Sequence, residues 1–219
     1  TKYPFTQVIE KFSFDLHTGQ INWVWAIILA FASINILLFI YSGFAITLKR
    51  TKTRINNKYK ANECEFILLV GSENGSTLGF ANQIHKQLQA NGKKSYLTDM
   101  NNYVNFSSAK QLLIFTSTYG LGEAPINAKK FKKLVCEFPQ KQNIQYSVVG
   151  FGSKSYPDFC AYAKEVDVLL SEQSWAEKSI KLHTVNDKSA EEFTQWLSVW
   201  ANLNSLAIAT APSLYSQKA

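Results

Sequence analysis

An uninterrupted apolar segment near the start of the chain sets the first limit on its fold. Residues 23–48 read WVWAIILAFASINILLFIYSGFAITL and contain no Asp, Glu, Lys or Arg. About 20 apolar residues cross a hydrocarbon core of about 30 Å, and an isolated crossing satisfies its backbone hydrogen bonds only as a helix. A buried core helix of this length would carry a polar stripe. The segment therefore predicts one transmembrane helix over residues 22–48, and its small and polar residues Ser33, Asn35, Ser42 and Gly43 indicate packing against other transmembrane helices.

The positive charge of the chain is concentrated beside this apolar segment. The formal net charge is +7, yet residues 49–60 carry six basic and no acidic residues, and residues 61–219 carry 15 basic against 14 acidic residues. A DNA-binding protein would present its positive charge on a folded face, so this distribution argues against a nucleic-acid partner. Basic residues that follow a span place its C-terminal side in the cytoplasm, whereas those of a secretory signal peptide precede the apolar run.

These observations predict a protein of the cell inner membrane. We expect residues 1–21 to form a periplasmic stub, residues 49–63 to form a basic juxtamembrane linker, and the remaining residues to lie in the cytoplasm. Cys64, Cys136 and Cys160 form no CxxC pair. Unpaired thiols are consistent with a cytoplasmic domain, and their spacing gives no structural zinc site.

Beyond residue 63 the sequence alternates between strand-like and helix-like segments. Short runs of branched apolar residues, such as EFILLVG at residues 65–71, are typical of strands buried on both faces. The predicted strands are residues 65–71, 94–99, 111–118, 145–152 and 178–183, and the predicted helices are residues 77–91, 126–138, 158–174 and 189–204. The alternation favours an α/β fold with a doubly wound parallel sheet, in which ligands bind beyond the carboxyl ends of the strands.

The loop after the first predicted strand is suited to a phosphate. Residues 72–77 read SENGST and stand directly before a predicted helix, whose unpaired N–H groups and dipole favour an anion. The loop lacks the Lys of a Walker loop and the GxGxxG pattern of dinucleotide folds, so a terminal monoester phosphate fits it better than a triphosphate or a pyrophosphate. An ordinary helix cap formed by Ser76 or Thr77 is the alternative.

Two further loops each bring an aromatic residue to the same edge of the predicted sheet. Residues 116–125 (TSTYGLGEAP) carry Tyr119, and residues 150–157 (GFGSKSYP) carry Tyr156. Their glycines let the backbone approach a planar ligand, and two aromatic faces stack on one ring and keep water from it. Either tyrosine alone is typical of an exposed loop, but the coincidence of three loops favours one ligand site.

Together these motifs resemble the FMN-binding, flavodoxin-like domain of the diflavin reductases, the family of sulfite reductase flavoproteins and NADPH–cytochrome reductases. The resemblance implies a flavodoxin-like, five-stranded doubly wound parallel sheet of order 2-1-3-4-5 in residues 64–204. In that family a Ser/Thr-Gly-Asn/Thr loop holds the FMN phosphate, and a Thr-Tyr-Gly-x-Gly-Glu/Asp loop and a Gly-x-Gly-x-x-x-Tyr loop carry the aromatics that stack on the flavin. The implied FMN-binding residues are Ser72, Glu73, Asn74, Gly75, Ser76, Thr77, Ser117, Thr118, Tyr119, Gly120, Gly122, Gly150, Gly152, Ser153, Tyr156 and Phe159.

The chain departs from the family pattern at two of these loops. Glu73 places a carboxylate where a neutral residue is common, so it either points to solvent or weakens the affinity for phosphate. Leu121 stands where an acidic residue is common, which argues against docking to a separate haem protein. Residues 205–219 resemble the linker that precedes the FAD- and NADPH-binding module in the family, so FAD and NADPH are expected on a module outside this sequence.

The apolar segment carries a second resemblance. Residues 12–50, with Leu-His-Thr-Gly before the span, resemble the last membrane segment of PepSY-type membrane proteins. In that setting His17 is either a haem ligand or a polar interfacial histidine, and we favour the second interpretation because the sequence offers no second ligand.

The two resemblances imply a membrane-anchored FMN electron-transfer module of an NADPH-dependent flavoprotein reductase, an oxidoreductase part that relays electrons from FAD to a membrane or periplasmic acceptor. Its expected partners are an FAD/NADPH module and other transmembrane helices, and the redox chemistry is that of the flavin, with no catalytic residue in the chain itself. The alternative from another class is a membrane-tethered, flavodoxin-like binding module without redox activity.

Overall fold

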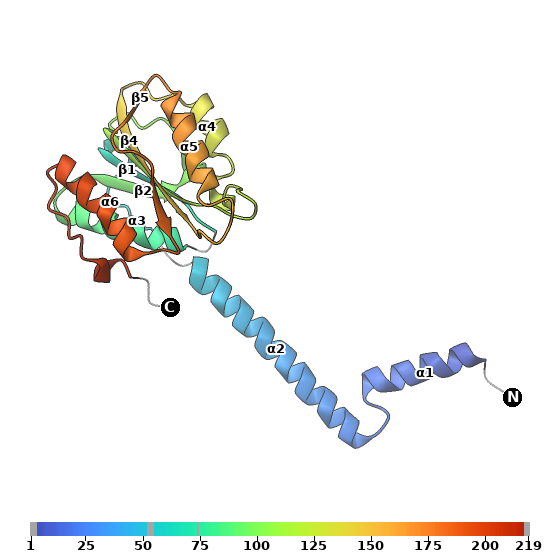
Figure 1. The fold of residues 1–219 in the computed structure, drawn as a ribbon. Coiled ribbons are helices and arrows are strands. Elements are labelled where there is room, and N and C mark those ends of the chain that lie inside the picture. The colour runs from blue at the N-terminus through green and yellow to red at the C-terminus, as the bar shows by residue number, and fades with distance from the viewer. Residues whose placement is uncertain (1–3, 52–54, 74, 217–219) are drawn as a thin grey trace. The chain divides into compact units, whose positions relative to one another are not determined.

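A computed structural model describes residues 4–51, 55–73 and 75–216 of the chain. The chain divides into two compact units, Thr1–Arg54 and Ile55–Ala219. Figure 1 shows helices in the first unit and a sheet covered by helices in the second.

The first unit consists of the helices α1 (Phe5–Thr18) and α2 (Trp23–Thr51). Among the described residues, α2 is the one helix that is long and apolar enough to cross a membrane, judged by length and composition: Trp23–Thr47 spans 25 residues with a mean hydropathy of 2.4, and none of it is buried. This helix coincides with the predicted span. Lys52 and Arg54, part of the predicted basic linker, lie outside the described residues.

The second unit contains a parallel sheet in the order β2-β1-β3-β4-β5, with β6 also paired to β4. The strand order predicted from the sequence is therefore confirmed. The strands are β1 (Phe66–Gly71), β2 (Ser95–Asp99), β3 (Gln111–Ser117), β4 (Ile144–Gly152), β5 (Ala176–Lys178) and β6 (His183–Asn186).

Helices cover both faces of this sheet. They are α3 (Ser76–Ala90), α4 (Phe131–Glu137), α5 (Ala161–Ser171) and α6 (Ala190–Leu203), and in Figure 1 α3 and α6 lie on one face and α4 and α5 on the other. Alternate residues of each central strand enter opposite cores: Ile67 and Leu69 of β1 pack on the α4/α5 side, and Leu68 and Val70 pack on the α3/α6 side. Burial on both faces explains why these strands are continuous apolar runs.

The fifth strand position differs from the prediction. A single strand was predicted at residues 178–183, but two short strands, β5 and β6, pair with the two ends of β4, and residues 179–182 between them are not in a strand. The helix predicted at residues 126–138 is also shorter, because a 3₁₀ turn, η3 (Ile126–Ala128), precedes α4.

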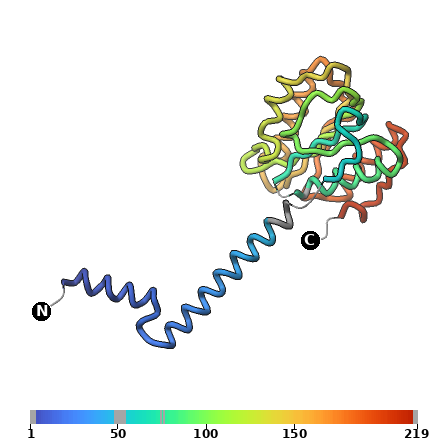
Figure 2. The backbone as a smooth tube through the Cα atoms, turned by 180° about the vertical axis from the view of Figure 1, so that it is seen from behind, coloured from blue at the N-terminus to red at the C-terminus, as the bar shows by residue number. Residues whose placement is uncertain are grey.

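The C-terminal residues pack along the α3/α6 side of the unit (Figure 2). Tyr215 is buried, and its ring lies 5.1 Å from that of Phe193. The Gln87 side chain of α3 binds this segment, donating to the Tyr215 hydroxyl over 2.7 Å and to the Ala209 carbonyl over 3.5 Å, and accepting from the Ala209 N–H over 2.7 Å. Residues that resemble a linker in sequence thus complete one of the two cores as far as Tyr215.

A buried histidine joins α3 to the start of this unit. His85 is 1% exposed, and its Nδ1 lies 2.8 Å from the Ser95 hydroxyl of β2, while its Nε2 lies 3.4 Å from the Asn56 carbonyl oxygen. The neighbouring Asn57 side chain pairs with both the N–H and the carbonyl of Leu97, as an added strand would. Residues 56–57 are therefore bound to α3 and to the edge strand β2.

We predict that the stability of this unit falls in mild acid because of His85. Burial lowers the pKa of His85, and the hydrogen bond with the Asn56 carbonyl opposes this shift only in part. The unfolded chain therefore binds a proton below about pH 6.5 that the folded chain resists, and the free energy of unfolding decreases as the pH falls below that value, whereas above it this group has no effect.

Urea unfolding followed by circular dichroism in a non-ionic detergent, at about pH 7.5 and about pH 5.5, tests this prediction. His85→Gln is expected to flatten the pH dependence, whereas the control His17→Gln, at an exposed position in α1, is expected to retain it. An equal pH dependence in the protein and in His85→Gln would contradict the assignment.

Candidate functional site

The loops that follow β1, β3 and β4 meet around two adjoining pockets at the carboxyl edge of the sheet. The larger pocket has a volume of about 410 Å³ and lies between the loops after β3 and β4; the smaller, of about 230 Å³, adds the loop after β1. Thr118, Tyr119, Gly152 and Ser153 line both pockets. The larger volume lies within the range of about 300–1,000 Å³ that is typical of small-molecule sites.

Two hydroxyl groups at the β1 end of this site are buried without a partner. Neither Ser72 Oγ nor Thr77 Oγ1 has a hydrogen-bond partner among the described residues. Gly75, in the left-handed region at φ +71°, is the N-cap of α3, and no side chain that the structure describes caps the helix. Thr77 therefore does not act as an ordinary helix cap, while the side chain of Ser76 and the whole of Asn74 lie outside the described residues.

Unpaired buried hydroxyls are uncommon in folded proteins, because each one costs about 1–3 kcal/mol unless a ligand, ion or water satisfies it. Here both stand at the open N-terminus of a 15-residue helix, where N–H groups and the helix dipole attract an anion. The donor set is neutral and fits a phosphate monoester.

Two hydrogen bonds join the loop after β1 to the turn η3. The Ser72 N–H donates to Asn127 Oδ1 over 2.8 Å, and Glu73 Oε1 accepts from the Ile126 N–H over 2.9 Å. Asn127 in turn donates to Asp99 Oδ1 over 2.9 Å at the end of β2. One oxygen of the Glu73 carboxylate thus accepts a hydrogen bond from the backbone of η3. The sequence had suggested that this side chain either points to solvent or weakens the affinity for phosphate, and this contact was not among those expectations.

The loop after β3 is closed by its own backbone. Tyr119 and Glu123 exchange both backbone hydrogen bonds, at 2.9 and 2.7 Å, and Gly120 and Gly122 between them have φ values of +53° and +99°, which favour glycine. The Thr118 hydroxyl accepts from the Tyr162 N–H of α5 over 3.2 Å, so the loop is also fixed to the helix that follows β4.

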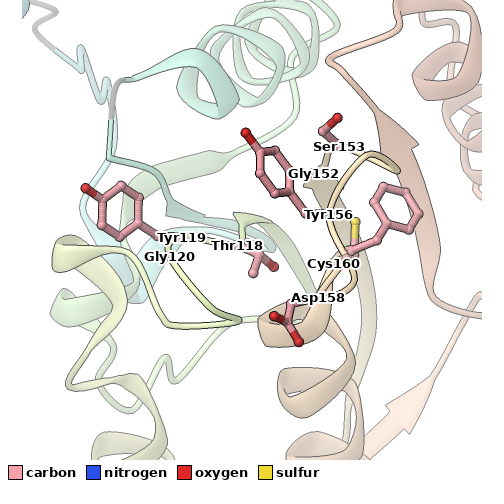
Figure 3. A pocket seen from close by; sticks show the side chains of 9 residues that line it. Thr118, Tyr119, Gly120, Gly152, Ser153, Tyr156, Asp158 and Cys160 are labelled. Atoms are coloured by element: carbon pink, nitrogen blue, oxygen red, sulfur yellow. The ribbon is translucent and has the colours of Figure 1, made fainter.

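Tyr119 and Tyr156 stand on different loops at the larger pocket, and space separates their rings (Figure 3). The side chains are 54% and 68% exposed, and no ring contact joins the two among the described residues. Both rings can therefore stack on a planar ligand without first breaking an internal contact.

Most predicted site residues that the structure describes line one of the two pockets. Thr118, Tyr119, Gly120, Gly152, Ser153, Tyr156 and Phe159 line the larger pocket, and Ser72, Glu73 and Ser117 line the smaller one. Gly75, Thr77, Gly122 and Gly150 line neither pocket. Gly150 instead permits close packing, since a Cβ there would lie 2.5 Å from the Cβ of Ala163 in α5.

Five lining residues were not predicted: Asp158 and Cys160 at the larger pocket, and Phe151, Asp187 and Lys188 at the smaller one. Asp187 and Lys188 directly follow β6, with φ values of +45° and +62°. The Asp187 N–H donates to the Gly152 carbonyl over 2.8 Å, which holds this turn beside the loop after β4. Had the sequence analysis ended the fifth strand at Asn186, both residues would have been predicted as site residues, because ligands bind beyond the carboxyl ends of the strands in such folds.

The pocket also contains a thiol that is not reactive. Cys160 is buried, and burial raises the pKa of its thiol to about 11, so the thiolate is scarce at neutral pH. The backbone of Cys160 is left-handed at φ +54°, and its atoms lie against the positions that side chains at Gly150 and Gly152 would occupy. The residue shapes the pocket wall.

The sequence of this domain is similar to those of known flavoproteins. A family profile described as flavodoxin matches residues 68–200. The chain is 30% identical over 168 residues to the sulfite reductase [NADPH] flavoprotein alpha-component of Shewanella oneidensis, covering 74% of this chain and 26% of that protein. It is 31% identical over 161 residues to the alpha-component of Bacillus subtilis, covering 70% and 26%. It is also 35% identical over 116 residues to the inducible nitric oxide synthase of Oncorhynchus mykiss, covering 51% and 24%.

Solved structures of flavodoxins share the fold of the second unit. The oxidised flavodoxin 2 of Bacillus cereus superposes with a TM-score of 0.56 at 20% identity, covering 64% of this chain and 99% of that one. A mutant flavodoxin of Pseudomonas aeruginosa superposes with a TM-score of 0.53 at 22% identity, covering 63% and 96%. The chain spans about a quarter of the length of the curated relatives named above.

We predict that Gly150→Ala destabilises the second unit through packing and not through the pocket. The new methyl group would overlap the Ala163 side chain and approach Cys160, and such overpacking costs about 1–3 kcal/mol. The urea midpoint of the unit is expected to decrease, whereas Gly43→Ala, where no atom lies within 4 Å of the added Cβ, leaves it unchanged. An unchanged midpoint in Gly150→Ala would mean that α5 and β4 approach less closely than described.

Proposed function

The chain belongs to the flavodoxin family, and on that basis we propose that residues 64–204 bind FMN and transfer electrons as the flavodoxin-like module of an NADPH-dependent flavoprotein reductase. Homology to the sulfite reductase flavoproteins supports the reductase context. The observation that carries the proposal is the pair of unpartnered hydroxyls, Ser72 Oγ and Thr77 Oγ1, at the helix end of a site whose opposite side presents two exposed tyrosines.

The residues present fit FMN at both ends. The loop at residues 72–77 and the N-terminus of α3 would hold the phosphate through neutral hydroxyl and backbone donors. Tyr119 and Tyr156 would cover the two faces of the flavin ring, with Thr118, Gly152 and Ser153 forming the pocket wall between them. Bound FMN supplies one- and two-electron redox chemistry.

The protein itself contributes position and shielding. The Tyr119–Glu123 backbone pair and the bond from Tyr162 to Thr118 fix one wall of the pocket, and the bond from Asp187 to Gly152 fixes the other. Rigid walls hold a ring in one geometry and exclude water, which are the means by which a flavoprotein sets its redox properties. No catalytic residue is assigned, and the electron donor is expected to be the FAD of an NADPH-binding module.

Membrane attachment belongs to the same proposal. The apolar helix α2 would anchor the module, with the flavodoxin-like domain on the cytoplasmic side, because the basic residues follow the helix in the sequence. The resemblance of residues 12–50 to the last segment of PepSY-type proteins favours an acceptor in the membrane or in the periplasm. A tethered binding module without redox activity is what would remain if the domain did not take up flavin.

We predict that Ser72→Ala and Thr77→Val each weaken the binding of FMN but not of riboflavin. Each change removes a hydroxyl donor to a charged phosphate, which is worth about 1.5–3 kcal/mol, or about 10- to 100-fold in affinity. Titration of the flavin-free protein with both ligands, followed by the quenching of flavin fluorescence, measures the effect. Ser107→Ala, at an exposed hydroxyl remote from the pockets, is the control.

A protein that binds neither flavin, and shows no flavin absorbance after incubation with FMN, would remove the redox proposal. Equal losses for FMN and riboflavin in the two variants would instead place the phosphate elsewhere.

We predict that Tyr119→Ala and Tyr156→Ala each weaken flavin binding about tenfold, for FMN and riboflavin alike, because each loses one stacking face. Tyr119→Phe and Tyr156→Phe retain the ring and are expected to bind as the parent protein does. Leu121→Ala changes an exposed side chain of the same loop outside the larger pocket and serves as the control. Normal affinity in both alanine variants would show that the wrong loops have been assigned.

A further inference from the structure

Helix α1 has an apolar face that no described residue covers. Phe5, Val8, Ile9 and Phe12 are 79%, 53%, 51% and 62% exposed, and none of the residues in α1 is buried. Their spacing of three and four residues, which continues to the half-buried Leu16, places them on one side of the helix. Isolated exposed apolar residues need no explanation, but a continuous face that covers 12 residues of a 14-residue helix does.

The length of α1 excludes a second membrane crossing. Fourteen residues at about 1.5 Å each reach about 21 Å, which is less than a hydrocarbon core of about 30 Å. The helix also cannot extend α2, because it ends at Gly19 in the left-handed region at φ +77°. An exposed apolar face on a helix too short to span is typical of a helix that lies in a membrane interface.

Contacts between the end of α1 and the start of α2 determine at which membrane depth α1 would end if α2 spans the bilayer. The indole N–H of Trp25, in the first turn of α2, donates to the Leu16 carbonyl over 2.7 Å. A Cβ on Gly19 would lie 3.2 Å from the Cα of Ala26, so the turn packs closely against α2. The last turn of α1 therefore lies beside the first turn of the apolar helix, where Trp23 and Trp25 mark the headgroup level of a spanning helix.

We propose that α1 binds the phospholipid interface on the N-terminal side of α2, with the face formed by Phe5, Val8, Ile9, Phe12 and Leu16 turned toward the acyl chains. This rests on the proposed insertion of α2 into the membrane. The occupant of the face is the bilayer itself, because the junction holds α1 at the level where apolar chains and headgroups meet.

The charges of α1 indicate which lipids it needs. The helix carries Glu10, Lys11 and Asp15, so it has no excess of positive charge that would attract anionic headgroups. Its binding depends on apolar burial, and pure phosphatidylcholine is a sufficient surface. This separates α1 from basic amphipathic helices, which require acidic lipid.

Fluorescent labelling of the full chain in phosphatidylcholine vesicles tests the proposal. In a Cys136→Ser background, in which the remaining thiols of Cys64 and Cys160 are buried, the polarity-sensitive label NBD is attached at Phe12→Cys on the apolar face, at Gln7→Cys on the polar face, or at Ile34→Cys in α2. Quenching by aqueous iodide and by lipids with a doxyl group near the headgroup reports where each label lies. Neither substituted residue of α1 belongs to the linings of the two pockets.

We expect the label at Phe12→Cys to be quenched several-fold less by iodide, and more by the spin-labelled lipid, than the label at Gln7→Cys, with or without added phosphatidylglycerol. Equal quenching at the two positions would overturn the proposal, as would a requirement for phosphatidylglycerol. Protection from iodide without quenching by lipid would mean that protein covers the face, which also overturns it. Iodide access at Ile34→Cys would show that α2 is not embedded, in which case the anchoring part of the proposed function fails together with this inference, whereas FMN binding is measured independently.

Discussion

A parallel sheet that is covered on both faces leaves its central strands in contact with solvent only at their ends, and the site follows from this constraint. Residues such as Leu68 and Leu69 of β1 are buried on opposite sides of the sheet, so polar groups for a ligand have to come from the strand ends. At the carboxyl ends the loops after β1, β3 and β4 stand side by side, because these three strands are neighbours in the order β2-β1-β3-β4-β5. The pockets form where the loops meet.

The sequence predicted what depends on continuous apolar runs and on local motifs. The central strands were predicted from their burial on both faces and the long apolar helix from its uninterrupted apolar length, and the two tyrosine loops were recognised as loops that follow strands from their glycine-rich motifs. The fifth strand was placed wrongly. As an edge position it pairs only with β4, is interrupted between Lys178 and His183, and has no strong apolar run to mark it.

The other misses involve contacts between distant residues. Asn127 lies outside every predicted motif, yet its side chain holds the Ser72 N–H. The state of Ser72 Oγ and Thr77 Oγ1, buried and unpaired, follows only from the packing around them. Conversely, Gly150 belongs to a motif that resembles a flavin loop, but its position against Ala163 gives it a packing role. A motif therefore indicates which loop takes part and not what each residue in it does.

Helix α3 connects the proposed phosphate site to both chain ends of the domain. Its N-terminus stands at the proposed phosphate site, His85 in its middle contacts Asn56 before β1, and Gln87 and Asn91 near its end bind residues that follow α6. Ile55 and residues 206–215 thus pack on the α3 side of the sheet, and neither segment lines the larger pocket, whose tyrosines stay exposed. If FMN binds in the larger pocket as proposed, attachment along this helix would leave the flavin edge open to an electron donor or acceptor, so the proposed tethering and electron transfer would use separate surfaces of the same domain.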